Sequence, residues 1–270
     1  PAGPQDGPEE LQAVYTAAGP AYFAIKTLED LAEVLGSIPL LYQPGTQWRY
    51  SSAVDIQALM VERLSGKPFE VYLQEAIFAP LGMADTGHYV PEDQQYRLTE
   101  IYTPSDDGKL VPHPNAWHTE HVVDPQTLKQ GGSGLASTID DYALFAQMLL
   151  NEGSLEGVEI LQPETVRLMA TDHLPADIGD QHFLPMNGKV GFGIDFAVRY
   201  GPPESDGWPY GVVGEYFWSG AGGTSFWIDP ENELFAIIMS QRFPFDGSIL
   251  KDFRDAVYNK MHRQVVQSEG

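Results

Sequence analysis

Apolar residues recur at helical spacing in three segments of the first half of the chain. Thr27 can cap the first segment and Gly36 can end it, while the second follows Tyr50 and ends at Gly66. The third spans residues 138–153. The apolar positions are Leu28, Leu31, Val34 and Leu35 in the first segment, Ile56, Leu59, Met60 and Leu64 in the second, and Tyr142, Phe145, Met148 and Leu149 in the third. This pattern predicts three amphipathic helices whose apolar and aromatic side chains belong to the core.

The pattern changes at residue 189 to short β-branched and aromatic runs. These runs are KVGFGIDFAVR, EYFWSG, GTSFWIDP and NELFAIIMSQ, and the last two are joined by DPEN, which predicts an antiparallel hairpin. A final helix is expected to pack on the sheet through Ile249, Phe253, Val257 and Met261. The sequence therefore predicts one α+β domain over residues 1–270, with a mainly helical lobe at 1–188 and antiparallel strands and a C-terminal helix at 189–270.

Composition narrows the range of partners. The 15 Lys and Arg against 38 Asp and Glu give a net charge of −23, which disfavours nucleic acid and anionic membranes as partners. No apolar run reaches the roughly 18 residues of a membrane helix, and the start, PAGPQDGPEE, lacks a signal-peptide pattern, which slightly favours a cytoplasmic location. The chain has no cysteine, which excludes disulfides and thiolate chemistry.

Four polar residues in the segment HPNAWHTEH are candidate metal ligands. They are His113, His118, Glu120 and His121, and HTEH is one residue short of the His-x-x-Glu-His pattern of some zinc peptidases. The segment is rich in Pro and shows no helical periodicity that would hold two imidazoles on one face. We therefore expect no metal site here.

Two serine motifs suggest a nucleophile but fit poorly. GGSGL around Ser133 departs from Gly-x-Ser-x-Gly at its fifth position and precedes a helix instead of joining a strand to one. Ser248 and Lys251 form a literal Ser-x-x-Lys, in which the lysine amine could deprotonate the serine. That pair begins the terminal helix, on the outer face of the predicted sheet. We expect neither serine to be catalytic.

Four segments together resemble the serine β-lactamase-like superfamily, and most closely its esterase branch, the family VIII carboxylesterases. The segments are PGTQWRYSSAVD, SGKPFEVYLQEAIFAPLGMADTG, GGSGLASTIDDYALFAQMLLNEG and GEYFWSGAGGTSFWIDPENELFAIIMSQ. The superfamily also contains class C β-lactamases and DD-peptidases. The resemblance implies an antiparallel sheet flanked by helices, a mostly helical second lobe and an active site in the cleft between them.

The resemblance also assigns site residues. It matches Tyr50, Ser51 and Ser52 to the Tyr-x-Asn box, and Trp218, Ser219 and Gly220 to the Lys-Thr-Gly box. An unperturbed phenol has a pKa of about 10, so Tyr50 can accept a serine proton only beside a cation such as lysine. The Ala221 amide is implied as half of an oxyanion hole. The residues alone leave an alternative open, in which Tyr50 is structural and its hydroxyl only forms a hydrogen bond at a buried turn.

Two departures from the family motifs bear on the substrate. Ser52 replaces the asparagine amide, and Trp218 replaces a lysine whose charge would favour a carboxylate. Both changes point to small uncharged esters, with no cofactor. Ser219 can still hydrogen-bond a carboxylate, which leaves β-lactamase or DD-peptidase-type activity as an alternative.

The family's Ser-x-x-Lys nucleophile has no match between Pro1 and Arg49. Strands that pair beside the last strand in the family are missing too, so we expect an uncovered sheet edge around residues 235–240. The sequence thus predicts a serine hydrolase whose nucleophile lies on an absent N-terminal segment or on a second chain. The alternative from a different class is a non-catalytic fragment or binding module.

Overall fold

The computed structural model describes residues 13–14, 17, 25–114, 117–178, 181–182, 189–202 and 211–268. The chain forms two compact units. The first comprises Pro1–Leu98, Trp117–Asp141 and Leu174–Phe183, and the second Thr99–Ala116, Tyr142–His173 and Leu184–Gly270. Both units are discontinuous in sequence, whereas the sequence pattern placed one boundary at residues 188/189. None of the described helices has the length and apolar character needed to cross a membrane.

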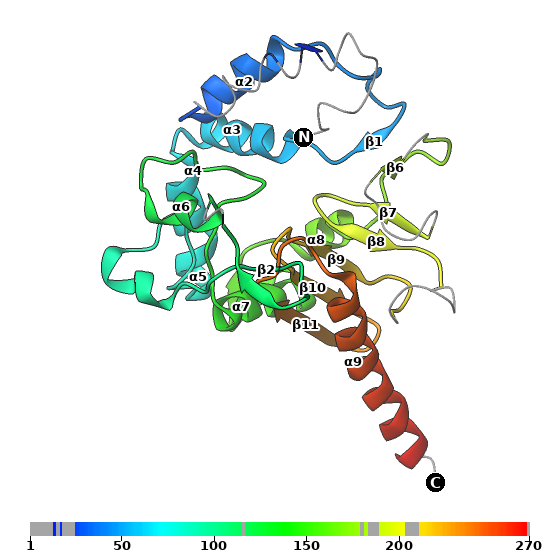
Figure 1. Ribbon diagram of the computed structural model, residues 1–270. Coiled ribbons are helices and arrows are strands. Elements are labelled where there is room, and N and C mark those ends of the chain that lie inside the picture. Colours follow the sequence, from blue (N-terminus) through cyan, green and yellow to red (C-terminus); the bar gives the residue numbers. More distant parts are fainter. Residues whose placement is uncertain are drawn as a thin grey trace. The chain divides into compact units, whose positions relative to one another are not determined.

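The first unit is mostly helical (Figure 1). Its helices are α2 (Leu28–Gly36), α3 (Ala53–Ser65), α4 (Phe69–Leu73), a π-helical turn (Gln74–Phe78), α5 (Ala79–Leu81), a 3-10 helix (Glu92–Arg97) and α6 (Trp117–Val123). Strand β1 (Trp48–Arg49) pairs in parallel with β6 (Gln181–His182). The helix α6 begins within HPNAWHTEH, a segment whose sequence shows no helical periodicity. It is only seven residues long, too short for apolar periodicity to be visible in the sequence.

The predicted caps of the first two helices are present. The hydroxyl of Thr27 accepts the backbone N–H of Asp30 at 3.1 Å, and Gly66 ends α3 in the left-handed conformation with φ 70°. The buried apolar side chains of both helices form one cluster. Its buried members are Ile25, Leu28, Leu31, Ala58, Leu59 and Phe69. The amphipathic pattern therefore predicted the packing of Leu28, Leu31 and Leu59 correctly. It was wrong for Met60 and Leu64 of α3, which are 55% and 84% exposed.

The second unit contains a five-stranded antiparallel sheet. Its strands are β7 (Val190–Phe192), β8 (Ala197–Arg199), β9 (Tyr216–Ser219), β10 (Thr224–Asp229) and β11 (Leu234–Met239), in the order β11-β10-β9-β8-β7. The unit also has two small hairpins, β2 (Tyr102–Pro104) with β3 (Leu110–Pro112) and β4 (Ser154–Leu155) with β5 (Val158–Glu159). The predicted hairpin is confirmed as β10 and β11, and β11 is an edge strand of the described sheet.

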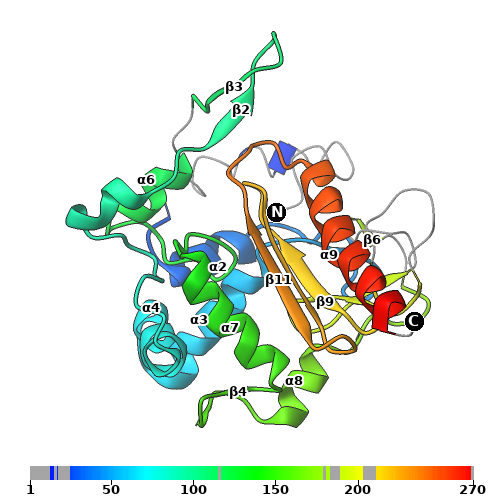
Figure 2. The same cartoon turned by 90° about the horizontal axis from the view of Figure 1, so that it is seen from below.

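Helices cover both faces of this sheet. They are α7 (Ile139–Leu150), α8 (Pro163–Met169) and α9 (Gly247–Ser268). Neighbouring residues of β10 point to opposite faces: Phe226 lies 5.2 Å from the ring of Tyr142 on α7, and Trp227 lies 5.5 Å from the ring of Phe253 on α9. Figure 2 shows α9 beside the strands, running in roughly the same direction as β9 and β11. Because α7 packs against β10, residues 142–173 belong to the same unit as the strands.

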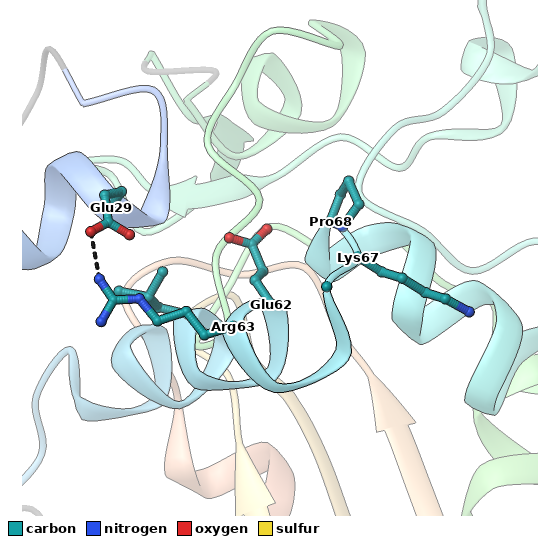
Figure 3. A pocket seen from close by; sticks show the side chains of 7 residues that line it. Glu29, Glu62, Arg63, Lys67 and Pro68 are labelled. Carbon is teal, nitrogen blue, oxygen red and sulfur yellow. Dashed lines mark hydrogen bonds and ion pairs between the residues drawn. The ribbon is translucent and has the colours of Figure 1, made fainter.

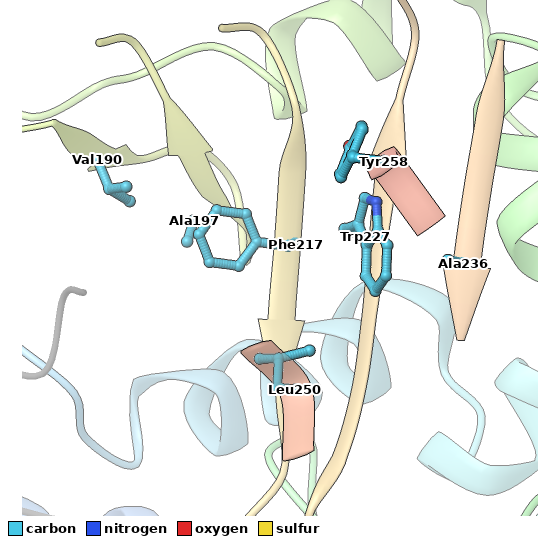
Figure 4. Close-up of a cluster of buried hydrophobic side chains, with 7 residues drawn as sticks. All are labelled: Val190, Ala197, Phe217, Trp227, Ala236, Leu250 and Tyr258. Atoms are coloured by element: carbon cyan, nitrogen blue, oxygen red, sulfur yellow. The ribbon is translucent and has the colours of Figure 1, made fainter. Parts of the chain in front are cut away.

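The buried face of α9 agrees only in part with the predicted one. Phe253 and Val257 pack against the sheet as expected, but the most buried residues are others. Leu250, Arg254 and Tyr258 are buried, whereas Ile249 is only partly so, and the side chain of Met261 lies outside the described residues. Leu250 and Tyr258 join a cluster with Val190, Ala197, Phe217, Trp227 and Ala236 (Figure 4). The most buried face of α9 is therefore displaced by one residue from the predicted one. It includes Arg254, and apolar periodicity assigns an arginine to the surface.

A buried ionic network explains the displacement. Arg254 Nη1 donates to both carboxylate oxygens of Glu215 at 2.9 Å, and Arg199 Nε donates to the same carboxylate at 2.8 Å. The Tyr258 hydroxyl donates to Asp229 at 2.8 Å. The Arg254 guanidinium also lies 4.3 Å from the ring centroid of Trp227. Hydrogen bonds and an aromatic face thus compensate the charge that α9 buries.

Candidate active site

Tyr50 and Ser52 lie in the first unit, in the short turn between β1 and α3. Tyr50 is half-buried and Ser52 is 8% exposed. The Ser52 carbonyl accepts the N–H groups of Asp55 at 3.1 Å and Ile56 at 3.3 Å, so this residue begins the helix. The backbone of Tyr50 therefore lies directly before a helix N-terminus, which regular backbone hydrogen bonds to Ser52 form.

The loop formed by residues 130–134 packs against this helix start. The Asp55 carboxylate accepts the N–H of Gly132 at 3.0 Å, and a side chain at Gly131 would place its Cβ 2.3 Å from the Val54 carbonyl oxygen. The buried His88 donates from Nε2 to the Gln130 carbonyl at 2.9 Å, because a carbonyl can only accept. The glycines of GGSGL thus permit close packing beside the helix that follows Tyr50.

Neither serine motif is arranged as a nucleophile with a base. The Ser133 hydroxyl donates to the Gln130 side chain at 2.5 Å. The Ser248 hydroxyl donates to Asp246 at 2.6 Å, and Lys251 forms an ion pair with Asp255 at 2.6 Å, so this lysine is directed along α9 toward a carboxylate. A Ser–Lys catalytic pair would instead need the amine within reach of the hydroxyl.

The histidine-rich segment is divided between the two units. His113 lies in the second unit with its ring 5.3 Å from that of Phe243, while α6, which carries Glu120 and His121, lies in the first. The side chain of His118 is outside the described part of the chain. Among the side chains that are described, no three His, Asp or Glu groups are placed to hold a metal ion.

Trp218, Ser219, Gly220 and Ala221 lie in the second unit, at the end of β9 and in the turn after it. The Ser219 hydroxyl is 2.6 Å from that of Ser225 on β10. Gly220 donates its N–H to Thr224 at 2.8 Å, and Gly223 donates to Gly220 at 3.0 Å, which closes the turn. Ala221 is exposed, and its N–H donates to no group in the described ranges. This amide is available to a ligand.

Two glycines of this turn are required by geometry. A Cβ at Gly220 would lie 2.5 Å from the Thr224 hydroxyl oxygen. Gly223 has φ 94°, and a Cβ there would lie 2.3 Å from the Ser240 hydroxyl oxygen. Tyr50 and Ser52 on one side, and residues 218–221 on the other, belong to separate units, so the structure describes the two halves of the predicted site individually.

A surface pocket of about 350 Å³ lies elsewhere in the first unit (Figure 3). It is lined by Glu29, Leu59, Glu62, Arg63, Gly66, Lys67 and Pro68. Arg63 donates to Glu29 across it at 2.5 Å, but both side chains are more than half exposed, so this pair contributes little stability. The pocket contains none of the predicted site residues.

A family model described as Beta-lactamase matches residues 4–259. The chain belongs to the beta-lactamase family. It is 36% identical over 213 residues to Protein Rv1367c of Mycobacterium tuberculosis, covering 78% of this chain and 52% of that protein. It is 29% identical over 252 residues to lovastatin esterase of Penicillium rubens, covering 87% and 60%. The chain thus spans about half the length of these relatives.

The comparison with solved structures establishes the fold. Simvastatin synthase (LovD) from Aspergillus terreus matches with a TM-score of 0.73 and 25% identity, covering 92% of this chain and 64% of that one. The predicted β-lactamase/DD-peptidase-like fold, with an antiparallel sheet and flanking helices, is confirmed.

The sequence did not point to Asp55 or His88 as supports of the Tyr50 segment, because their partners are 77 and 42 residues away.

Proposed function

We propose that this chain is the larger part of a serine hydrolase that acts through an acyl-enzyme on small uncharged esters. The observation that carries the proposal is the exposed Ala221 amide, which follows the Trp218-Ser219-Gly220 box and donates to no described group. An open N–H at this position suits the oxygen of a tetrahedral intermediate. The similarity to lovastatin esterase supports the esterase branch.

The proposed nucleophile is a serine with its lysine, on a segment that precedes Pro1 or on a second chain. The serine oxygen attacks the ester carbonyl while its proton passes to the Tyr50 oxygen, which the lysine cation keeps ionised. The carbonyl oxygen becomes an oxyanion that accepts the Ala221 N–H. Tyr50 then returns the proton to the departing alkoxide, and the acyl group stays on the serine. Water then attacks the acyl carbonyl while the same phenolate takes its proton. The bond to the serine breaks, the serine oxygen takes this proton from Tyr50, and the acid leaves.

The substrate assignment rests on Trp218. Its indole is partly buried beside the apolar cluster of the sheet, where the family motif has a lysine. An indole offers apolar contact and no positive charge to a carboxylate. An ester without a carboxylate therefore suits this position better than a β-lactam does.

One observation favours a second candidate, a β-lactamase or DD-peptidase-type amide hydrolase. The Ser219 hydroxyl lies in the box and is half-buried, and it retains a lone pair or proton beyond its contact with Ser225. Such a hydroxyl can bind the carboxylate of a β-lactam or peptide.

A labelling experiment tests the proposal. The full-length gene product should react with a fluorophosphonate probe and hydrolyse p-nitrophenyl butyrate, whereas residues 1–270 alone should do neither. In the full-length protein, Tyr50→Phe should lower kcat/KM by roughly 10²- to 10⁴-fold. Tyr96→Phe, at a tyrosine that is 82% exposed, is the matched control and should leave turnover unchanged.

Three results would contradict the proposal. A full-length protein that binds neither probe nor substrate would indicate a non-catalytic module. Stoichiometric labelling of residues 1–270 at Ser248 or Ser133 would place the nucleophile on this chain. Near-normal turnover of Tyr50→Phe would remove the phenol from the mechanism.

A further inference from the structure

Strand β8 covers only part of β9. The ladder between them consists of two pairs, Ala197 with Phe217 and Val198 with Tyr216. β9 continues through Ser219, and on its other side β10 pairs with it as far as Ser219. Among the described residues, the β8–β9 ladder therefore stops one pair short of Trp218. The tight turn closed by the Gly193 N–H and the Phe196 carbonyl comes directly before β8 at this step in the pairing.

The aromatic ring of Phe192 lies at this step. Phe192 is the last residue of β7 and pairs with Ala197, the residue at which β8 begins. Its ring is 5.4 Å from that of Trp218 at an interplanar angle of 77°, an edge-to-face contact. Phe192 thus extends from β7 to the Trp218 box next to the end of the β8 ladder.

The backbone holds Phe192 firmly in this position. Its N–H donates to the Asp172 carboxylate at 3.0 Å, and its carbonyl accepts the N–H of His173 at 2.9 Å. Gly191 allows the close approach, because a Cβ there would lie 2.1 Å from the Asp172 carboxyl carbon. The ring is therefore anchored by the residues that follow α8, and it cannot withdraw without breaking two hydrogen bonds.

We propose that Phe192 is a specificity-determining residue, which together with Trp218 limits the length of the apolar acyl chain that the enzyme accepts. The inference rests on the proposed function, in which the ester carbonyl oxygen accepts the Ala221 N–H. The acyl chain then lies along the end of β9, beyond the last pair of the β8–β9 ladder, and the Phe192 ring bounds it. Short acyl chains fit in front of the ring, and longer ones meet it.

The test is the dependence of kcat/KM on acyl length in the full-length gene product. The substrates are p-nitrophenyl acetate, butyrate, hexanoate and octanoate. In Phe192→Ala, each methylene that enters the vacated space should gain up to about fourfold, the factor for burying one CH₂ group. We expect the octanoate-to-butyrate ratio of kcat/KM in Phe192→Ala to rise at least about tenfold over that of the unaltered enzyme. Phe192→Leu should give a smaller rise, and it serves as the second test if the alanine variant does not fold.

Phe253→Ala is the matched control. It also removes a phenyl ring that contacts a tryptophan edge-on, at 5.5 Å and 70°, but that tryptophan is Trp227 under α9. A general loosening of the sheet would change the octanoate-to-butyrate ratio equally in Phe192→Ala and Phe253→Ala. A local effect of Phe192 would change it only in Phe192→Ala. An unchanged ratio in both Phe192 variants, or an equal change in Phe253→Ala, would overturn the inference while leaving the esterase function intact. Failure of the unaltered enzyme to hydrolyse any of the esters would overturn both.

Discussion

The carboxylate of Asp55 accepts the backbone N–H of Gly132 at 3.0 Å, which joins the first turn of α3 to a loop 77 residues away. Asp55 is 5% exposed, so the bond is shielded from water. The same loop touches Val54 so closely that Gly131 has no room for a Cβ. The helix start that follows Tyr50 is therefore held by the GGSGL segment, whose role here is packing.

The first prediction concerns this contact. Asp55→Ala leaves the Gly132 N–H without its acceptor and should lower the free energy of unfolding by about 1–3 kcal/mol. Urea denaturation followed by circular dichroism measures the change. Asp55→Asn keeps a side-chain oxygen and should lose less. Equal stability of the alanine variant and the unaltered chain would show that water replaces the carboxylate.

The second prediction concerns His88 and pH. Burial lowers the pKa of His88 below its ordinary value of 6.5, and nearby Lys129 lowers it further, although the Gln130 carbonyl and Glu70 act in the opposite direction. The unfolded chain thus binds the proton at higher pH than the folded one, so stability should fall as the pH drops from about 7 to 5. His88→Gln can still donate to the Gln130 carbonyl but does not titrate.

Urea denaturation at several pH values checks this prediction. The unaltered chain should lose more stability between pH 7 and pH 5 than His88→Gln does. If the free energy of unfolding depends on pH in the same way in both proteins, groups other than His88 cause the loss of stability at low pH.

The third prediction concerns the ionic network under α9. Glu215→Gln removes the charge that compensates Arg199 and Arg254, and an unbalanced buried charge should cost about 3–5 kcal/mol. Glu231→Gln removes the same charge at an exposed site and should change stability little. Thermal unfolding compares them. If both variants melt at the same temperature, the network contributes no more than a surface glutamate.

Local sequence signals predicted much of the fold. Thr27 begins α2 and Gly66 ends α3 as expected, and the β10–β11 hairpin has the predicted antiparallel pairing. These features depend on residues within a few positions of one another, so caps, turns and alternation are sufficient to find them.

Features that depend on distant partners were missed. The α9 face was displaced because Arg254 is buried against Glu215, 39 residues earlier, and no apolar pattern marks a compensated arginine as core. Phe192 reads in the sequence as one more apolar strand residue. Its position beside Trp218 follows from where the β8 ladder ends, which the pairing register decides.

The last prediction concerns Trp218 and the choice between an ester and a β-lactam. The family lysine at this position would attract a carboxylate, and the indole replaces that charge with apolar surface. The full-length enzyme should therefore prefer p-nitrophenyl butyrate over a cephalosporin by at least about tenfold in kcat/KM, the scale of one modest polar interaction. Trp218→Lys should narrow this gap by restoring the charge.

Val213→Lys separates a local charge from a general one. Val213 is 54% exposed in the same unit, so this variant adds the same charge at a surface position outside the box. If both lysine variants narrow the gap equally, net charge and not Trp218 sets the preference. If the unaltered enzyme prefers the cephalosporin, the Ser219 hydroxyl is sufficient to bind the carboxylate, and the β-lactamase alternative takes precedence over the esterase.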